Sequence, residues 1–83
     1  MKKEYILNYL TKNKSLMFKK YGITKLGLFG SYARDEATTK SDIDIAIELK
    51  KDKKILNNFL SIKRELESIF NRIVDLGISP YFF

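Results

Sequence analysis

Two aspartates separated by one isoleucine, Asp42 and Asp44, are the residues of this chain best suited to chemistry. Both lie in "DIDIAIEL", and alternation along a strand would place both carboxylates on one face, at most about 6.6 Å apart. Two negative charges at that distance repel by roughly 2–3 kcal/mol at an effective dielectric near 20. A divalent cation would reverse this interaction, and oxygen ligands favour Mg²⁺ or Mn²⁺. The simpler alternative is a strand with one polar face turned to water.

A Gly-Ser pair, Gly30 and Ser31, stands ten residues before Asp42. A strand that ends in glycine and turns into a short helix exposes backbone N–H groups, which together with the serine hydroxyl can hold a phosphate. Glycine also lets a phosphate approach the main chain closely. Alone, the pair is far more often an ordinary turn, in which Ser31 caps one helical turn. Combined with the two carboxylates, it indicates a nucleotide–metal site.

The elements that must position these residues follow from the apolar spacing. Helices are predicted around residues 5–10 and over 15–21, with Ser15 as the cap and Gly22 as the end of the second. Asp52 is the predicted cap of a third helix, whose apolar residues are Ile55, Phe59, Ile62, Leu66, Ile69 and Ile73, and which is expected to fray near Asn71. Strands are predicted over 23–29, 42–49 and 72–78. This order implies an α/β (α+β) fold, a small mixed sheet of three to four strands with helices packed on one face.

The size and composition narrow the chemistry further. The 83 residues form one predicted domain, 1–83, without cysteine or histidine, so acid–base and metal chemistry must rest on carboxylates. The net charge of +6 comes from lysines spread along the chain, so charge alone does not indicate direct nucleic-acid binding. The N-terminal apolar residues are interrupted by Glu4, Asn8 and Lys12, which does not suit an export signal. We therefore expect a cytoplasmic protein with no membrane span.

The segment "LFGSYARDEATTKSDIDIAIE" resembles the signature of the DNA polymerase β-type nucleotidyltransferase superfamily. It is most similar to the minimal nucleotidyltransferases that accompany HEPN-domain toxins, and the resemblance runs from about Tyr21 to Leu76. It implies that Gly30 and Ser31 hold the nucleotide phosphates and that Asp42 and Asp44 bind metal. Asp75, in "IVDLG", matches the third carboxylate, a metal ligand and base for the incoming hydroxyl.

The resemblance also implies a reaction. Two Mg²⁺ ions, or Mn²⁺ in their place, would act with ATP as substrate, and AMP would pass to a hydroxyl, in this family a tyrosine of a HEPN ribonuclease toxin that is thereby silenced. Two alternatives stay open: an antitoxin that neutralises its partner by binding alone, and a nucleotidyltransferase that acts on RNA or a small molecule.

Three residues near the motif, Arg34, Ser41 and Asp35, also bear on the predicted site. Arg34 lies three residues after Ser31, so the two can share a helical face and Arg34 is a candidate phosphate contact. Ser41, directly before Asp42, is a further candidate for nucleotide binding. Asp35 replaces a glycine that the family commonly carries, which is expected either to alter the turn or to add an acid near the triphosphate. At the C-terminus, Tyr81, Phe82 and Phe83 are expected to close the core rather than to dock a partner.

Overall fold

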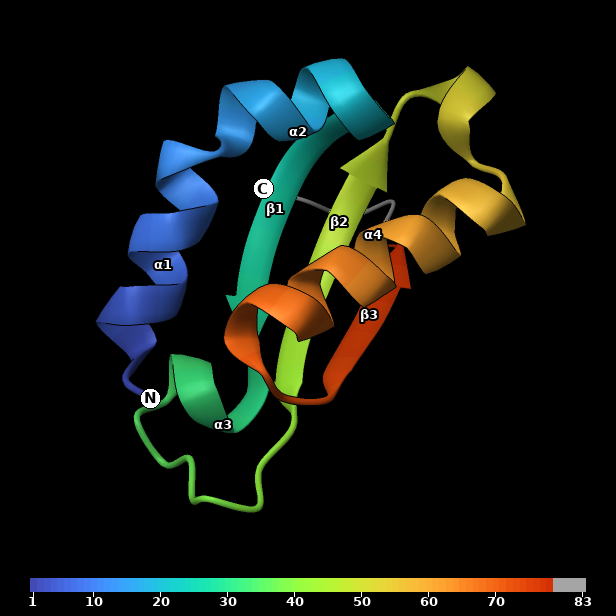
Figure 1. Ribbon diagram of the computed structural model, residues 1–83. Helices are drawn as coiled ribbons and strands as arrows, with labels where there is room; N and C mark the ends of the chain where they lie inside the picture. Colours follow the sequence, from blue (N-terminus) through green and yellow to red (C-terminus); the bar gives the residue numbers. More distant parts are fainter. Residues whose placement is uncertain (79–83) are drawn as a thin grey trace.

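The helices and strands follow the predicted order. The computed structural model describes residues 1–78, so the expectation for Tyr81, Phe82 and Phe83 lies outside the described residues. The elements, shown in Figure 1, are α1 (Lys3–Lys12), α2 (Lys14–Tyr21), β1 (Ile23–Phe29), α3 (Gly30–Ala33), β2 (Ile43–Leu49), the 3-10 turn η1 (Lys51–Lys53), α4 (Leu56–Phe70) and β3 (Val74–Ile78).

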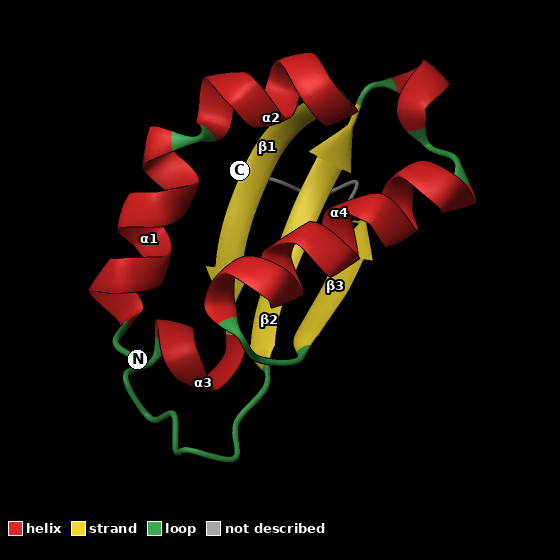
Figure 2. Ribbon diagram, viewed as in Figure 1, coloured by secondary structure: helices red, strands yellow, loops and turns green. Residues whose placement is uncertain are grey.

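The three strands form one mixed sheet in the order β1-β2-β3. β1 and β2 are antiparallel, whereas β2 and β3 are parallel and are connected through η1 and α4. Figure 2 shows α4 crossing in front of β2 and β3, while α1 and α2 lie along the β1 side. The predicted fold class, a small mixed sheet with helices on one face, is confirmed.

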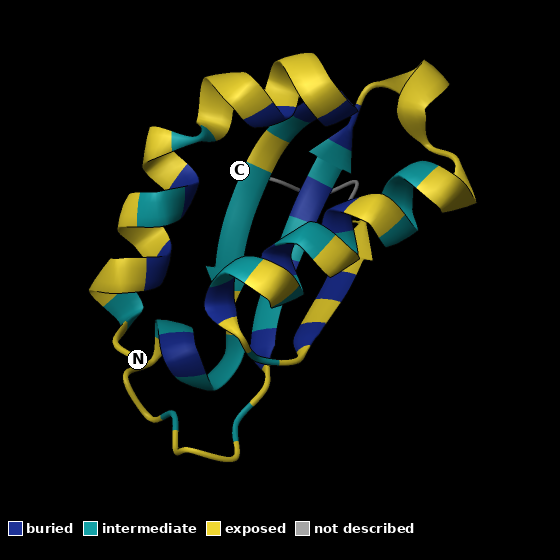
Figure 3. Ribbon diagram, viewed as in Figure 1, coloured by how far each residue is buried: buried dark blue, intermediate teal, exposed yellow. Residues whose placement is uncertain are grey.

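Alternation along β2 separates the core from the open face of the sheet. Ile43, Ile45, Ile47 and Leu49 are buried, and the residues between them are partly exposed. Figure 3 shows these alternating bands along the β2 ribbon. Because successive side chains of a strand point to opposite faces, the helices cover one face, and Asp44 belongs to the other.

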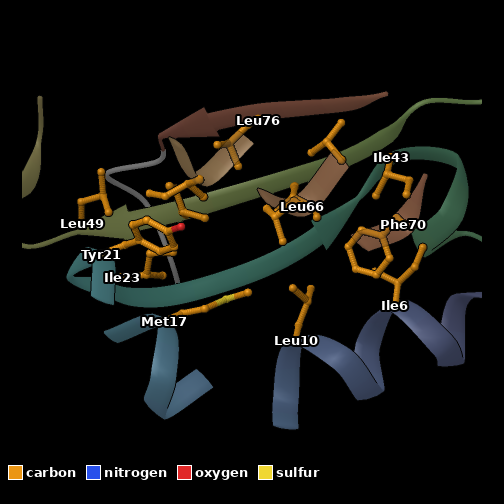
Figure 4. Packing of buried hydrophobic residues seen from close by; sticks show 14 of the residues in the cluster. Ile6, Leu10, Met17, Tyr21, Ile23, Ile43, Leu49, Leu66, Phe70 and Leu76 are labelled. Atoms are coloured by element: carbon orange, nitrogen blue, oxygen red, sulfur yellow. The ribbon is translucent and has the colours of Figure 1, made fainter. Parts of the chain in front are cut away.

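One continuous apolar cluster holds the helices on the sheet, as seen from close by in Figure 4. Its helical members are Ile6, Leu10, Met17, Tyr21, Tyr32, Ile62, Leu66 and Phe70. The rings of Tyr5 and Tyr9 meet the ring of Phe70 edge-on, with centroids 6.2 and 5.4 Å apart. These contacts fix α1 against α4, and thereby place α1 beside β1.

The predicted helix ends are partly wrong. Asn13 precedes α2 and Ile55 precedes α4, both without a side-chain cap, so neither Ser15 nor Asp52 is a cap. Ile55 and Ile73 extend the helical spacing beyond the helix and are 60% and 63% exposed. By contrast, Gly22 ends α2 in the left-handed conformation as predicted, and Asn71 ends α4 with φ 51°. None of the helices within residues 1–78 is long and apolar enough to cross a membrane.

Candidate active site

Gly30 stands at the end of β1 and begins the short helix α3. Its φ is 69°, a left-handed value that glycine adopts without strain. A Cβ at this position would collide with Oδ2 of Asp44 and would lie 2.9 Å from its Cγ. The absence of a side chain at Gly30 therefore lets the main chain at the start of α3 approach the Asp44 carboxylate directly.

The structure corrects the role predicted for Ser31 in the helix. Ser31 lies inside α3, and Phe29 precedes the helix without any side-chain cap. The Ser31 carbonyl accepts a hydrogen bond of 2.8 Å from the N–H of Glu36, which closes the turn after α3. Ser31 remains next to Gly30 and partly exposed, so its predicted contact with phosphate stays a prediction.

Asp44 and Asp75 are the carboxylates that the sheet brings together. They are register partners on the adjacent parallel strands β2 and β3, and Phe29 is the partner of Asp44 on β1. Directly opposed residues of neighbouring strands project to the same face, here the face away from the helices. Asp44 is partly buried and Asp75 is exposed.

The pKa of Asp44 is raised above its ordinary value, first because burial disfavours its charged form. The negative charge of Asp75 and a hydrogen bond shared between the two carboxyl groups act in the same direction, followed by the charge of Asp42. The positive charge of Arg34 opposes them. The charges of Asp75, Asp42 and Arg34 therefore all act on the Asp44 carboxyl group.

Asp42 does not lie on the strand, contrary to the sequence-based expectation. β2 begins at Ile43, and Asp42 is an exposed residue at the end of the preceding loop. The strand begins there because the N–H of Ile43 donates to the carbonyl of Ile73, at 3.0 Å, where β2 meets the chain that enters β3. The side-by-side pair on this sheet is thus Asp44 with Asp75, and Asp42 approaches from the loop.

Three contacts position the entrance to β3, and with it Asp75. The N–H of Val74 donates to Oε2 of Glu67 on α4, at 3.0 Å. The same oxygen accepts a hydrogen bond of 2.9 Å from Nζ of Lys63, one helical turn away. Arg72 donates from Nη1 to the carbonyl of Thr39, at 3.0 Å, which ties the loop before Asp42 to the start of β3.

The donor set suits a hard divalent cation. Within residues 1–78, no group of three or more His, Cys, Asp or Glu residues is arranged to hold a metal ion as the structure stands. Asp44 and Asp75 nevertheless offer carboxylate oxygens whose mutual repulsion a cation would relieve. These two residues, with Asp42 from the loop, therefore stay the candidates predicted to hold Mg²⁺ or Mn²⁺.

Arg34 and Ser41 have partners of their own in the loop that follows α3. The Nε of Arg34 lies 2.9 Å from Oε1 of Glu36, and both side chains are exposed. The Oγ of Ser41 accepts a hydrogen bond of 2.9 Å from the N–H of Thr38. Arg34 is close enough to Asp44 to lower its pKa, which suits a phosphate contact; nucleotide binding by either residue stays a prediction.

A pocket of about 210 Å³ lies over this part of the sheet. Asp44 and Asp75 line it together with Phe29, Ala46 and Gly77. These last three residues were not predicted from the sequence to belong to the site. Ala46 and Gly77 each follow an aspartate by two positions, so strand alternation already places them on the same face. Their small size leaves space beside the carboxylates.

Asp35 adopts φ 59°, so the position where the family commonly has glycine is left-handed here too. A non-glycine residue in this conformation is strained by about 1–2 kcal/mol, less for aspartate, and glycine relieves that strain. We expect Asp35→Gly to raise the free energy of unfolding in urea by up to about 1 kcal/mol. Asn71→Gly, at the other non-glycine residue with positive φ, is the matched control and should act alike. A clear loss of stability in Asp35→Gly would show instead that the Asp35 side chain stabilises the turn.

The raised pKa of Asp44 predicts a specific pH dependence of stability. A carboxyl whose folded pKa lies above its unfolded value stabilises the fold below the unfolded pKa, and this contribution is lost as pH rises through the folded pKa. The asparagine of Asp44→Asn does not titrate, so the variant should gain stability relative to the parent as pH rises above 3.8, the ordinary pKa of an aspartate carboxyl. Urea unfolding at a series of pH values measures the difference. A difference that stays constant, or that changes in the opposite direction, contradicts the assignment.

The fold and this site define the class of the protein. The nucleotidyltransferase domain model matches residues 11–82, and the chain belongs to that family. It is therefore a nucleotidyltransferase, an enzyme. Its candidate active site lies where β1 ends and where β2 and β3 begin.

Two relatives from archaea illustrate the similarity. The protein adenylyltransferase MntA of Thermococcus cleftensis is 34% identical over 73 residues, covering 88% of this chain and 73% of the relative. A protein of Methanocaldococcus jannaschii named "Putative protein adenylyltransferase MJ0128" is 38% identical over 73 residues, covering 88% of this chain and 74% of the relative. No solved structure matches the chain.

Proposed function

We propose that this nucleotidyltransferase transfers AMP from ATP to a hydroxyl group of a partner protein. The acceptor that we propose is a tyrosine of a HEPN ribonuclease toxin, so that the enzyme acts as its antitoxin in the cytoplasm. Similarity to proteins named as adenylyltransferases supports AMP as the transferred group. The observation that carries the proposal is the in-register pair of Asp44 and Asp75 beside Gly30.

The roles of the residues follow from their places in the site. The main chain at Gly30 and Ser31 would bind the triphosphate, with Arg34 balancing part of its charge. A bound divalent cation would supply charge neutralisation and would lower the pKa of the acceptor hydroxyl. Asp44 is partly buried on the central strand β2, so its carboxylate would hold that cation in a fixed position. Asp75, exposed on the outer strand, is accessible to the acceptor and would orient its hydroxyl or accept its proton.

The reaction is an in-line displacement at the α-phosphate. The acceptor oxygen forms a bond to the α-phosphorus, the bond to the bridging oxygen breaks, and pyrophosphate leaves. The hydroxyl proton passes to a base, for which Asp75 is the candidate. The protein contributes orientation of the reactants and fixed charges, which is how this kind of transfer is generally accelerated.

The test uses ATP labelled in the α-phosphate, Mg²⁺ and the protein product of the neighbouring gene. We expect label on that protein, and loss of the label with Asp44→Asn or Asp75→Asn. Asp52→Asn is the matched control, because Asp52 is an exposed carboxylate in η1, after the opposite end of β2. Mass spectrometry of the labelled protein would identify the modified side chain as tyrosine.

The same experiment distinguishes the alternatives. Neutralisation of the partner that survives both aspartate substitutions, with no label transferred, would identify an antitoxin that acts by binding alone. Label that appears on added RNA or on a small molecule, and not on protein, would identify a different acceptor. Either result would refute the proposed protein acceptor.

A further inference from the structure

A groove runs along β1, between this strand and the helices α1 and α2. It consists of two neighbouring pockets of about 450 and 260 Å³, both of which Thr11 and Lys14 line. The first pocket reaches Ile23 and Thr24 at the start of β1, and the second reaches Leu26, Gly27 and Leu28 near its end. We call this feature the β1 groove.

Among residues 1–78, one edge of the strand that lines the β1 groove has no neighbouring strand. β1 is the outer strand of the sheet and pairs only with β2 within residues 1–78. Side chains of successive residues point to opposite faces, so a pocket lined by three consecutive residues lies at the edge of the strand rather than over one face. The edge of an unpaired strand presents N–H and C=O groups that can pair with another extended chain.

The walls of the β1 groove combine apolar and hydroxyl groups. Leu7 of α1 is 37% exposed and Phe18 of α2 is 45% exposed, although both are large apolar residues. Thr11, Ser15 and Thr24 add hydroxyl groups to the lining. Apolar side chains beside a strand edge that pairs with no other strand in residues 1–78 suit an extended peptide, whose side chains alternate between the groove and solvent.

The rim of the β1 groove is positively charged. Lys12, Lys14 and Lys19 line the larger pocket and take part in none of the ion pairs formed among the described residues. Lys50 adds a further charge, with its Nζ 5.3 Å from the centroid of the Phe18 ring. Among the described residues, the linings of the two pockets include no acidic side chain, and the Glu48 carboxylate accepts a hydrogen bond of 2.8 Å from Oγ1 of the lining residue Thr24. Cations therefore outnumber acids around the groove.

We propose that the β1 groove binds an acidic, extended segment of a partner protein, which adds a strand at the outer edge of β1 beside Leu26, Gly27 and Leu28. The excess of lysines selects acidic side chains, and it disfavours a second copy of this chain, whose net charge is +6. The apolar side chains and the strand edge favour peptide over nucleic acid, which would engage the lysines alone. The bound segment runs from the basic end of β1 toward Gly30, where the strand meets the candidate active site.

The binding test does not depend on nucleotide transfer. The probe is a peptide of alternating glutamate and valine, titrated into ¹⁵N-labelled protein and followed by the amide signals. We expect saturable shifts at Leu26, Gly27 and Leu28. Lys14→Glu combined with Lys19→Glu should weaken binding at least about tenfold, because two attractive pairs become repulsive. Lys14→Gln with Lys19→Gln should give an intermediate loss.

The control is Lys54→Glu combined with Arg64→Glu, which reverses two exposed charges on residues that line neither pocket of the groove. It should change the affinity by no more than about twofold, since distant exposed charges are screened by salt. Three results would overturn the proposal: no saturable shift, an equal loss in the control, or tighter binding of oligouridine at the same amides. Thermal unfolding of each variant verifies that it is folded.

Discussion

Asp44→Asn is expected to lower the rate of nucleotide transfer by about 10²–10³-fold and to leave the protein at least as stable as the parent. The substitution keeps the shape of the side chain but removes the charge that would hold a cation beside Asp75. Losing one fixed charge of this kind costs about 10²–10³ in rate. The same change removes like-charge repulsion between directly opposed residues, so the free energy of unfolding at neutral pH should stay unchanged or rise by up to about 1 kcal/mol.

The opposite signs of the two effects separate a catalytic role from a structural one. Transfer of labelled AMP and urea unfolding should be measured on the same preparation. If Asp44 instead stabilised the fold, the Asp44→Asn protein would lose both stability and activity. Asp44→Asn with full activity, or with reduced activity that follows reduced stability, would contradict the role of Asp44 in the site.

Gly30→Ala is expected to lower both activity and stability. The left-handed backbone at φ 69° strains any residue with a Cβ, by about 1–2 kcal/mol. The added Cβ would also occupy the place of the Asp44 carboxylate oxygen, so the carboxylate must move. A displacement of about 1 Å in a reacting group can lower the rate about 10²-fold.

Gly22→Ala is the matched control for Gly30→Ala. Gly22 also has a positive φ, 73°, but it precedes the opposite end of β1, and a Cβ there would meet the flexible side chain of Lys53. Both variants should lose stability, and only Gly30→Ala should lose transfer in excess of its loss of folded protein. Equal activity of the two variants would show that the close contact of Gly30 with Asp44 does not serve the reaction.

The alternation in "DIDIAIEL" was sufficient to predict β2 and its faces, because a period of two identifies a strand with one buried face. It was not sufficient to place Asp42, since the first residue of the strand depends on where β3 begins to pair. The bond from Ile43 to Ile73 decides that point, and it joins residues 30 positions apart. The pairing of Asp44 with Asp75 was likewise not derivable from periodicity; the family resemblance indicated it, and the sheet register confirms that the two residues meet.

The helix caps and the β1 groove could not be predicted from the sequence, for a different reason. Ser15, Ser31 and Asp52 have side chains typical of caps, but a cap also requires that the helix begin at the next residue. The β1 groove was not predicted at all, because the identity of the edge strand depends on the order of strands in the sheet. In contrast, Ala46 and Gly77 could have been assigned to the site from their spacing behind the two aspartates.

We infer that Gly30, Asp44 and Asp75 together form a nucleotide–metal site. The most direct test is the paramagnetic broadening of amide signals by Mn²⁺ in the presence of ATP, recorded for ¹⁵N-labelled protein. We predict that the signals of Gly30, Asp44 and Asp75 broaden first, and that Asp44→Asn removes the effect. Broadening that spares these residues, or that persists unchanged in Asp44→Asn, would contradict the claim.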